Sequence, residues 1–165
     1  MELSKRPPGQ LKLFNFAKKE VSLSGQYQIS DFPRISEIAS NKKDNVKVDL
    51  SFYLENDKTP CVDGIIHLDI VLVCQRCLDD LSIALEVNFS LAFIRHNQES
   101  EGLESHIEVY VIKEEELATH DLISDEILLS IPMVPMHDYD CIKDIKEQEI
   151  VEGKSKNPFS ILKKI

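Results

Sequence analysis

Two long apolar runs joined by a cysteine-containing turn constrain the fold of this chain more than any other feature. Between Gly64 and Ile94, nearly every second residue is apolar on both sides of Cys74-Gln-Arg-Cys77. A period of two is that of a β-strand, so both runs are predicted to be strands. Residues 74–80 leave no room for a crossover helix, and the strands are therefore predicted to pair antiparallel as one long hairpin.

The flanking segments predict an α+β fold around this hairpin. The stretch from Val46 to Leu54 alternates in the same way, so three consecutive strands are expected to form a meander. Further strands are predicted at 20–27 and 107–112, and residues 11–16 are expected to form an edge strand or to pack beneath the sheet. A short helix is predicted after Pro33, and a longer one over Thr119–Ile131, which Pro132 ends. The expected architecture is an antiparallel β meander, or a partly closed barrel-like sheet, with a few short helices.

The 165 residues have room for one domain and mobile ends. We expect a single α+β domain over residues 1–141 and a flexible tail over 142–165, because residues 142–156 are charged and have no regular apolar stripe. The tail ends in Asn157-Pro-Phe-Ser-Ile-Leu-Lys-Lys-Ile165, which predicts a short amphipathic helix. Phe159 and Leu162 are its predicted anchors for docking, on the domain or on a partner.

Charge and composition limit the location and the partners. No apolar run approaches the roughly 20 residues of a membrane span, and the N-terminus has no apolar signal region, so a cytoplasmic protein without membrane association is predicted. A net charge of −10 argues against nucleic acid as a direct partner. The basic residues are nevertheless concentrated at the ends of the chain, with five in residues 1–20. If RNA is bound, the predicted contacts are Arg76 together with these five: Lys5, Arg6, Lys12, Lys18 and Lys19.

Cysteine and histidine spacing predicts a metal site. Cys74 and Cys77 are two residues apart in one turn, and His137 and Cys141 can supply the other two positions of a tetrahedral Cys3His zinc site. The gap from Cys77 to His137 is much longer than in zinc fingers, so paired buried or semi-exposed thiols are the alternative. A redox function is disfavoured, because a reactive CxxC pair begins a helix after a parallel strand. Cys61 is expected to be a small buried apolar residue.

No pattern of catalytic residues stands out in the sequence. It contains no glycine-rich phosphate loop, no GxSxG and no HExxH, and no histidine has a spacing typical of a triad. The acidic runs Glu114–Glu116 and Asp125-Glu126 are interpreted as solvated faces and helix starts. The chain is therefore predicted not to be an enzyme.

Three motifs in order resemble the YceD family of bacterial proteins, the large ribosomal RNA subunit accumulation proteins. They are CQRC at a strand end, DEILLSIPMVPMHDYDC, and the terminal NPFSILKK, and the resemblance covers roughly residues 45–165. It implies a non-catalytic factor needed for accumulation of 23S ribosomal RNA, acting in the biogenesis or stability of the large ribosomal subunit. The implied partners are ribosomal RNA or ribosomal proteins. The alternative is a zinc-stabilised interaction module that binds basic ribosomal proteins through acidic segments.

Overall fold

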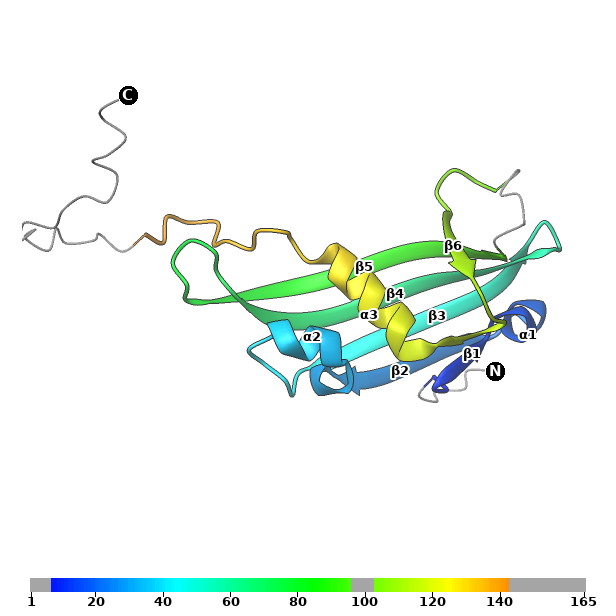
Figure 1. The fold of residues 1–165 in the computed structure, drawn as a ribbon, viewed down its shortest axis with the longest axis horizontal. Coiled ribbons are helices and arrows are strands. Elements are labelled where there is room, and N and C mark those ends of the chain that lie inside the picture. The colour runs from blue at the N-terminus through cyan, green and yellow to red at the C-terminus, as the bar shows by residue number, and fades with distance from the viewer. Residues whose placement is uncertain (1–6, 96–102, 143–165) are drawn as a thin grey trace, which may run out of the picture.

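A five-stranded sheet forms the body of the protein (Figure 1). The structure is a computed structural model that describes residues 7–95 and 103–142. In sheet order the strands are β2 (Ser22–Gln28), β3 (Asn45–Glu55), β4 (Thr59–Val73), β5 (Asp80–Arg95) and β6 (Glu108–Ile112). Neighbouring strands run antiparallel, except that β5 and β6 are parallel. The predicted α+β meander is confirmed, and the sheet is open rather than closed into a barrel.

The long hairpin of β4 and β5 is the central part of this sheet. Its strands pair from Cys61–Ala92 to Val73–Asp80, which confirms the predicted antiparallel register. The pairing begins before Gly64, where the alternation had suggested its start. Gly64 itself lies opposite Phe89, whose ring carbon Cζ is 2.0 Å from the place where a Cβ on Gly64 would lie. A side chain at Gly64 would therefore displace the Phe89 ring from the sheet surface.

The helix α3 (Thr119–Ser130) crosses one face of the sheet (Figure 1). It buries Leu122, Ile123 and Ile127 against the sheet, and it ends before Pro132 as the sequence predicts. The interpretation of Asp125-Glu126 as a solvated face is wrong for Glu126, which is only 8% exposed. Glu126 lies four residues after Leu122 and three after Ile123, so the helical period places it on the buried stripe.

The N-terminal segment closes one end of the same face. Residues 11–16, expected to form an edge strand or a packed segment, divide into β1 (Gln10–Lys12) and the helix α1 (Leu13–Lys18). Leu13 and Ala17 are buried one helical turn apart, which accounts for the helix. β1 pairs antiparallel with β7 (Glu116–Ala118), a strand that the sequence did not predict. The short elements η1 (Ile29–Asp31) and α2 (Pro33–Ile38) join β2 to β3.

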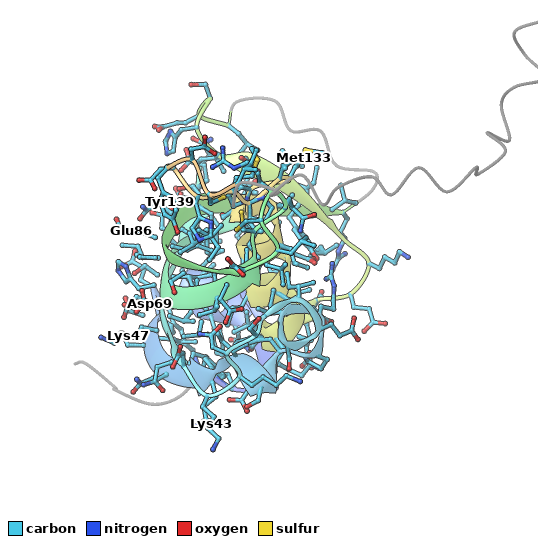
Figure 2. All side chains as sticks on the ribbon, turned by 90° about the vertical axis from the view of Figure 1, so that its left-hand side faces the viewer. Lys43, Lys47, Asp69, Glu86, Met133 and Tyr139 are labelled. Atoms are coloured by element: carbon cyan, nitrogen blue, oxygen red, sulfur yellow. The ribbon has the colours of Figure 1, made fainter. Side chains whose placement is uncertain are left out.

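The other face of the sheet is polar. Figure 2 shows Lys47, Asp69 and Glu86, from β3, β4 and β5, on the side that faces away from α3. The core therefore lies between the sheet and the helices, and the opposite face is open to solvent. Residues 1–6, 96–102 and 143–165 lie outside the described part of the chain, and they include Lys5, Arg6, Phe159, Leu162 and all of the predicted 142–165 tail except its first residue.

Candidate metal centre

The turn between β4 and β5 is tightly closed by its own backbone. The N–H of Cys74 donates to the carbonyl of Asp79 at 2.9 Å, and the N–H of Leu78 donates to the carbonyl of Cys74 at 2.9 Å. Leu78 has a φ of 64°, in the left-handed region that L-residues other than Gly rarely adopt. This backbone path returns the chain sharply enough for Cys74 and Cys77 to lie on the same side of the turn.

The segment after α3 is held against this turn. Pro132 and Pro135 keep it extended, and the carbonyl of Pro135 accepts a hydrogen bond from the N–H of Gln75 at 2.8 Å. Arg76 donates from Nε to Sγ of Cys141 at 3.2 Å, and from Nη2 to the carbonyl of His137 at 2.9 Å and to the carbonyl of Tyr139. Residues from two distant parts of the sequence are thereby fixed side by side.

These contacts bring the four predicted ligands together. Sγ of Cys74, Cys77 and Cys141 and a ring nitrogen of His137 all lie within 4.8 Å of one another, so the expected convergence is confirmed. The distance is 3.8 Å between Sγ of Cys74 and Sγ of Cys141, and 3.5 Å between Sγ of Cys77 and Nδ1 of His137. In a tetrahedral site, metal–sulfur distances of about 2.3 Å separate two sulfurs by about 3.8 Å, and a sulfur and an imidazole nitrogen by about 3.6 Å. The cluster can therefore hold a metal ion.

A backbone contact orients the ring of His137. Its Nε2 lies 3.2 Å from the carbonyl oxygen of Asp80. A carbonyl only accepts hydrogen bonds, so Nε2 carries a proton, and Nδ1 is the ring nitrogen that faces the sulfurs. The ring also packs against Tyr139, with 4.7 Å between ring centroids. Such a partner on the second nitrogen is the usual way in which a metal-binding histidine is oriented.

The electrostatics of the cluster favour thiolates at two of the three sulfurs. Burial raises the pKa of Cys74, but hydrogen bonds from the backbone N–H groups of Cys77 and Arg76 outweigh it and lower that pKa to about 5. The pKa of Cys141 is lowered too, because the bonds from Arg76 and His137 outweigh burial. At Cys77 the backbone N–H of Asp79 lowers the pKa, yet burial and the neighbouring sulfurs raise it overall. Metal ligation requires the thiolate form, which this environment supports.

Cys61 lies outside the cluster, as a buried residue of the sheet. Cys61 is fully buried in β4 beside Ala92, and mainly because of this burial its pKa is raised to about 11. It lies opposite Tyr53 of β3, far along the strand from the cysteine turn.

Cys74 and Cys77 occupy a turn between antiparallel strands, without a helix that starts at the first cysteine. The helix N-terminus that would activate a redox CxxC pair is therefore missing from this turn.

The predicted RNA contacts are not brought together. Arg76 uses Nε and Nη2 on the 137–141 segment, so these nitrogens do not point toward an external phosphate. Lys12 in β1 lies 3.7 Å from Glu116, and Lys18 and Lys19 are exposed at the end of α1. Figure 1 shows α1 and the β4–β5 turn at opposite ends of the sheet. Lys12, Lys18 and Lys19 therefore form no continuous surface with Arg76, and Lys5 and Arg6 are outside the described residues.

Sequence reasoning missed several supporting groups. The carbonyl of Asp80, the ring of Tyr139 and the Arg76 bond to Cys141 depend on how two segments meet, and no local pattern marks them. The same segment exposes Met133, which is 99% exposed, together with other apolar side chains. No helix in residues 7–95 or 103–142 has the length and apolarity needed to cross a membrane.

Comparison with known proteins gives a consistent match. The model of the family described as "Large ribosomal RNA subunit accumulation protein YceD" matches residues 62–165, which include all four residues of the cluster. The chain is 30% identical over 157 residues to a protein of Haemophilus influenzae with the same description, over 88% of each chain. No solved structure matches the present chain.

Proposed function

The chain belongs to the YceD family, and on this premise we propose that it is a non-catalytic factor needed for accumulation of 23S ribosomal RNA. In this role it acts in the biogenesis or stability of the large ribosomal subunit, in the cytoplasm. The observation that carries the proposal is the family match, which spans the hairpin, α3 and the cysteine–histidine segment. Its partners are then components of that subunit, either the RNA or the ribosomal proteins.

The metal that fits the cluster best is zinc. Three cysteines and one histidine at tetrahedral separations form a closed set, without an open position for substrate or water. Closed sets of this kind stabilise structure, whereas catalytic zinc sites keep one position open. Zinc in this site would tie the tip of the hairpin to the segment after α3, two parts of the chain that are some 60 residues apart in sequence. This role agrees with a binding protein rather than an enzyme.

Depletion of the protein in the organism that encodes it tests the proposed role. We expect the ratio of 23S to 16S ribosomal RNA to fall and large-subunit particles to decrease in a sucrose gradient. Complementation with the parent chain should restore both. Complementation with Cys74→Ala tests the cluster, and Cys61→Ala is its control because it removes a buried thiol outside the cluster. An unchanged 23S to 16S ratio after full depletion would refute the proposal.

A second candidate is a zinc-stabilised module that binds basic ribosomal proteins. The charge distribution favours it, because residues 103–142 contain ten acidic residues and Lys113 as their one Lys or Arg. Such a segment attracts cationic partners and repels phosphate. Capture of partners from lysate before and after RNase treatment distinguishes the candidates. Ribosomal proteins that remain bound after RNase support direct protein contact, and their loss supports contact through RNA.

A further inference from the structure

One edge of β5 is open over much of its length. β5 pairs with β4 over residues 80–92, but β6 covers its other edge only from Leu91 to Arg95. Within the described ranges, no other strand pairs with residues 80–90 of β5 on that side. Alternate residues there direct their N–H and carbonyl groups away from the sheet, as on any edge strand.

The even-numbered residues carry these outward groups. The last pair of the hairpin is Val73–Asp80, and the N–H of the next residue, Cys74, donates to the carbonyl of Asp79 at 2.9 Å. That pattern makes Val73–Asp80 a pair without mutual hydrogen bonds, and the two kinds of pair alternate along an antiparallel ladder. Asp80 fits this assignment, because its carbonyl bonds outward to His137. The residues oriented in the same way are Ser82, Ala84, Glu86 and Asn88.

This edge lacks the features that usually prevent strand addition. Natural edge strands are short, or carry Pro, Lys or a bulge that disrupts pairing with another chain. The sequence from Ser82 to Ser90, SIALEVNFS, has no Pro, Gly, Lys or Arg and alternates regularly. The partly buried side chains of Ile83 and Leu85 pack on the core and keep the strand in place. The edge is therefore a preformed template for one more strand.

The surroundings of the edge are acidic. Residues 77–94 contain three acids and no Lys or Arg, and residues 103–142 contain ten acids against Lys113. Where β6 begins, a hollow of about 390 Å³ is lined by Leu91, Glu108 and Glu126 among others. Arg34 also lines it, but the guanidinium is paired with Asp125. A chain lying along β5 toward this hollow would pass Asp80 and Glu86 and then reach Glu108.

We propose that residues 82–90 of β5 bind an extended, lysine-rich segment of a partner protein as an added strand. Backbone hydrogen bonds supply the affinity in this mode of recognition, and the acidic surroundings select a cationic segment. The same charges disfavour RNA at this edge, because phosphate would be repelled. The inference rests on the second candidate function, which it deepens by naming the surface and the partner chemistry. It does not depend on a bound metal.

Fluorescence anisotropy with the full chain and labelled synthetic peptides tests the proposal. The probe is a peptide of alternating lysine and threonine, which is soluble and favours an extended backbone. A peptide with glutamate in place of lysine controls for charge. A lysine peptide N-methylated at every second amide keeps the charge but cannot form the ladder. We expect the glutamate peptide not to bind, and N-methylation to weaken binding at least about tenfold, since several hydrogen bonds are lost.

A matched pair of variants tests the location on the protein. Ala84→Pro removes an outward N–H that β4 does not use, and Ala84→Ser keeps it at the same exposed position. We expect Ala84→Pro to weaken the lysine peptide at least about tenfold and Ala84→Ser to have little effect. Circular dichroism checks that both variants fold. If Ala84→Pro does not fold, binding of the N-methylated peptide to the parent chain tests the added strand instead.

Three results would overturn the proposal. They are no binding of the lysine peptide to the parent chain, equal binding of the N-methylated peptide, and unchanged binding by folded Ala84→Pro. A single-stranded RNA oligonucleotide that competes with the peptide and loses binding in Ala84→Pro would assign the edge to nucleic acid instead. Ribosomal RNA accumulation is measured separately in cells, so a failure here leaves that proposed role standing.

Discussion

Glu126 is expected to make this protein less stable as the pH rises toward neutrality. The residue is 8% exposed and lies on the buried stripe of α3. Burial, followed by the charges of Glu108 and Asp125, raises its pKa from 4.5 to about 7. The folded state therefore holds the proton more tightly than the unfolded state. The free energy of unfolding falls as the pH increases from about 4.5 to about 7, and it remains at the lower value above that range.

The size of the effect follows from the difference between the two pKa values. At about 1.4 kcal/mol for each tenfold change, a rise from 4.5 to about 7 corresponds to roughly 3 kcal/mol. Domains of this size are commonly stable by about 5–15 kcal/mol, so the cost is a large fraction of the total. Glu126→Gln keeps the shape of the side chain and removes its charge. We expect this variant to match the parent near pH 4 and to exceed it by about 3 kcal/mol at pH 8.

Urea denaturation of both proteins between pH 4 and pH 8 measures the effect. The difference between variant and parent isolates Glu126, because every other group titrates in both chains. Glu37→Gln, at an exposed position of α2, removes a carboxylate outside the core and is the matched control. A difference between Glu126→Gln and parent that stays flat from pH 5 to pH 8 would show that Glu126 is solvated in the folded protein and would refute the reasoning.

Three further predictions concern the metal, the basic residues and the tail. Elemental analysis of protein purified without chelator is expected to give one zinc per chain in the parent and in Cys61→Ala, but not in Cys74→Ala. Failure of the parent protein to take up added zinc would contradict the proposed centre. Deletion of residues 157–165 should leave the melting temperature nearly unchanged if the segment serves a partner, whereas a large loss would place it in the core. Replacing the five N-terminal basic residues by glutamine should weaken RNA binding at low salt without affecting the fold, and binding that does not change would rule out these contacts: Lys5, Arg6, Lys12, Lys18 and Lys19.

The parts of the fold that the sequence predicted are those with a long, regular pattern. The hairpin follows from a period of two sustained over both strands, and α3 follows from helical spacing ended by Pro132. The strands β1 and β7 have three residues each, too short for any period to be seen. These two strands pair because residues that flank them are also in contact. The N–H of Thr119, just after β7, donates a hydrogen bond to the carbonyl of Gly9, just before β1.

The candidate site was predictable in its ligands but not in its supports. Two short spacings, Cys74 to Cys77 and His137 to Cys141, mark the chelating pairs, and a turn and a strand-free segment can meet at one end of a sheet. The partner of Arg76 could not be predicted in the same way. The sequence predicts RNA as its partner, whereas the guanidinium bonds to carbonyls of a segment some 60 residues away. Long-range contacts of this kind leave no local pattern.

The hairpin tip, where the proposed metal centre lies, extends beyond the support of β3. β3 pairs with β4 only as far as Leu68, and beyond it the side chain of Asn41 bonds the carbonyl of Asp69 and the N–H of Val71. From Leu72 onward, the backbone hydrogen bonds described for β4 and β5 are made with each other and with the segment that carries His137 and Cys141.

A two-stranded ribbon is marginal by itself in water, so this end of the hairpin needs a further support. The proposed zinc would supply it by joining Cys74 and Cys77 of the turn to His137 and Cys141 of the adjoining segment. The same support fixes the start of the open β5 edge, because Asp80 both ends the ladder and bonds to His137. Loss of the metal should therefore increase motion at residues 80–84 and leave the Leu91 end of β5, which is held by β6, unchanged.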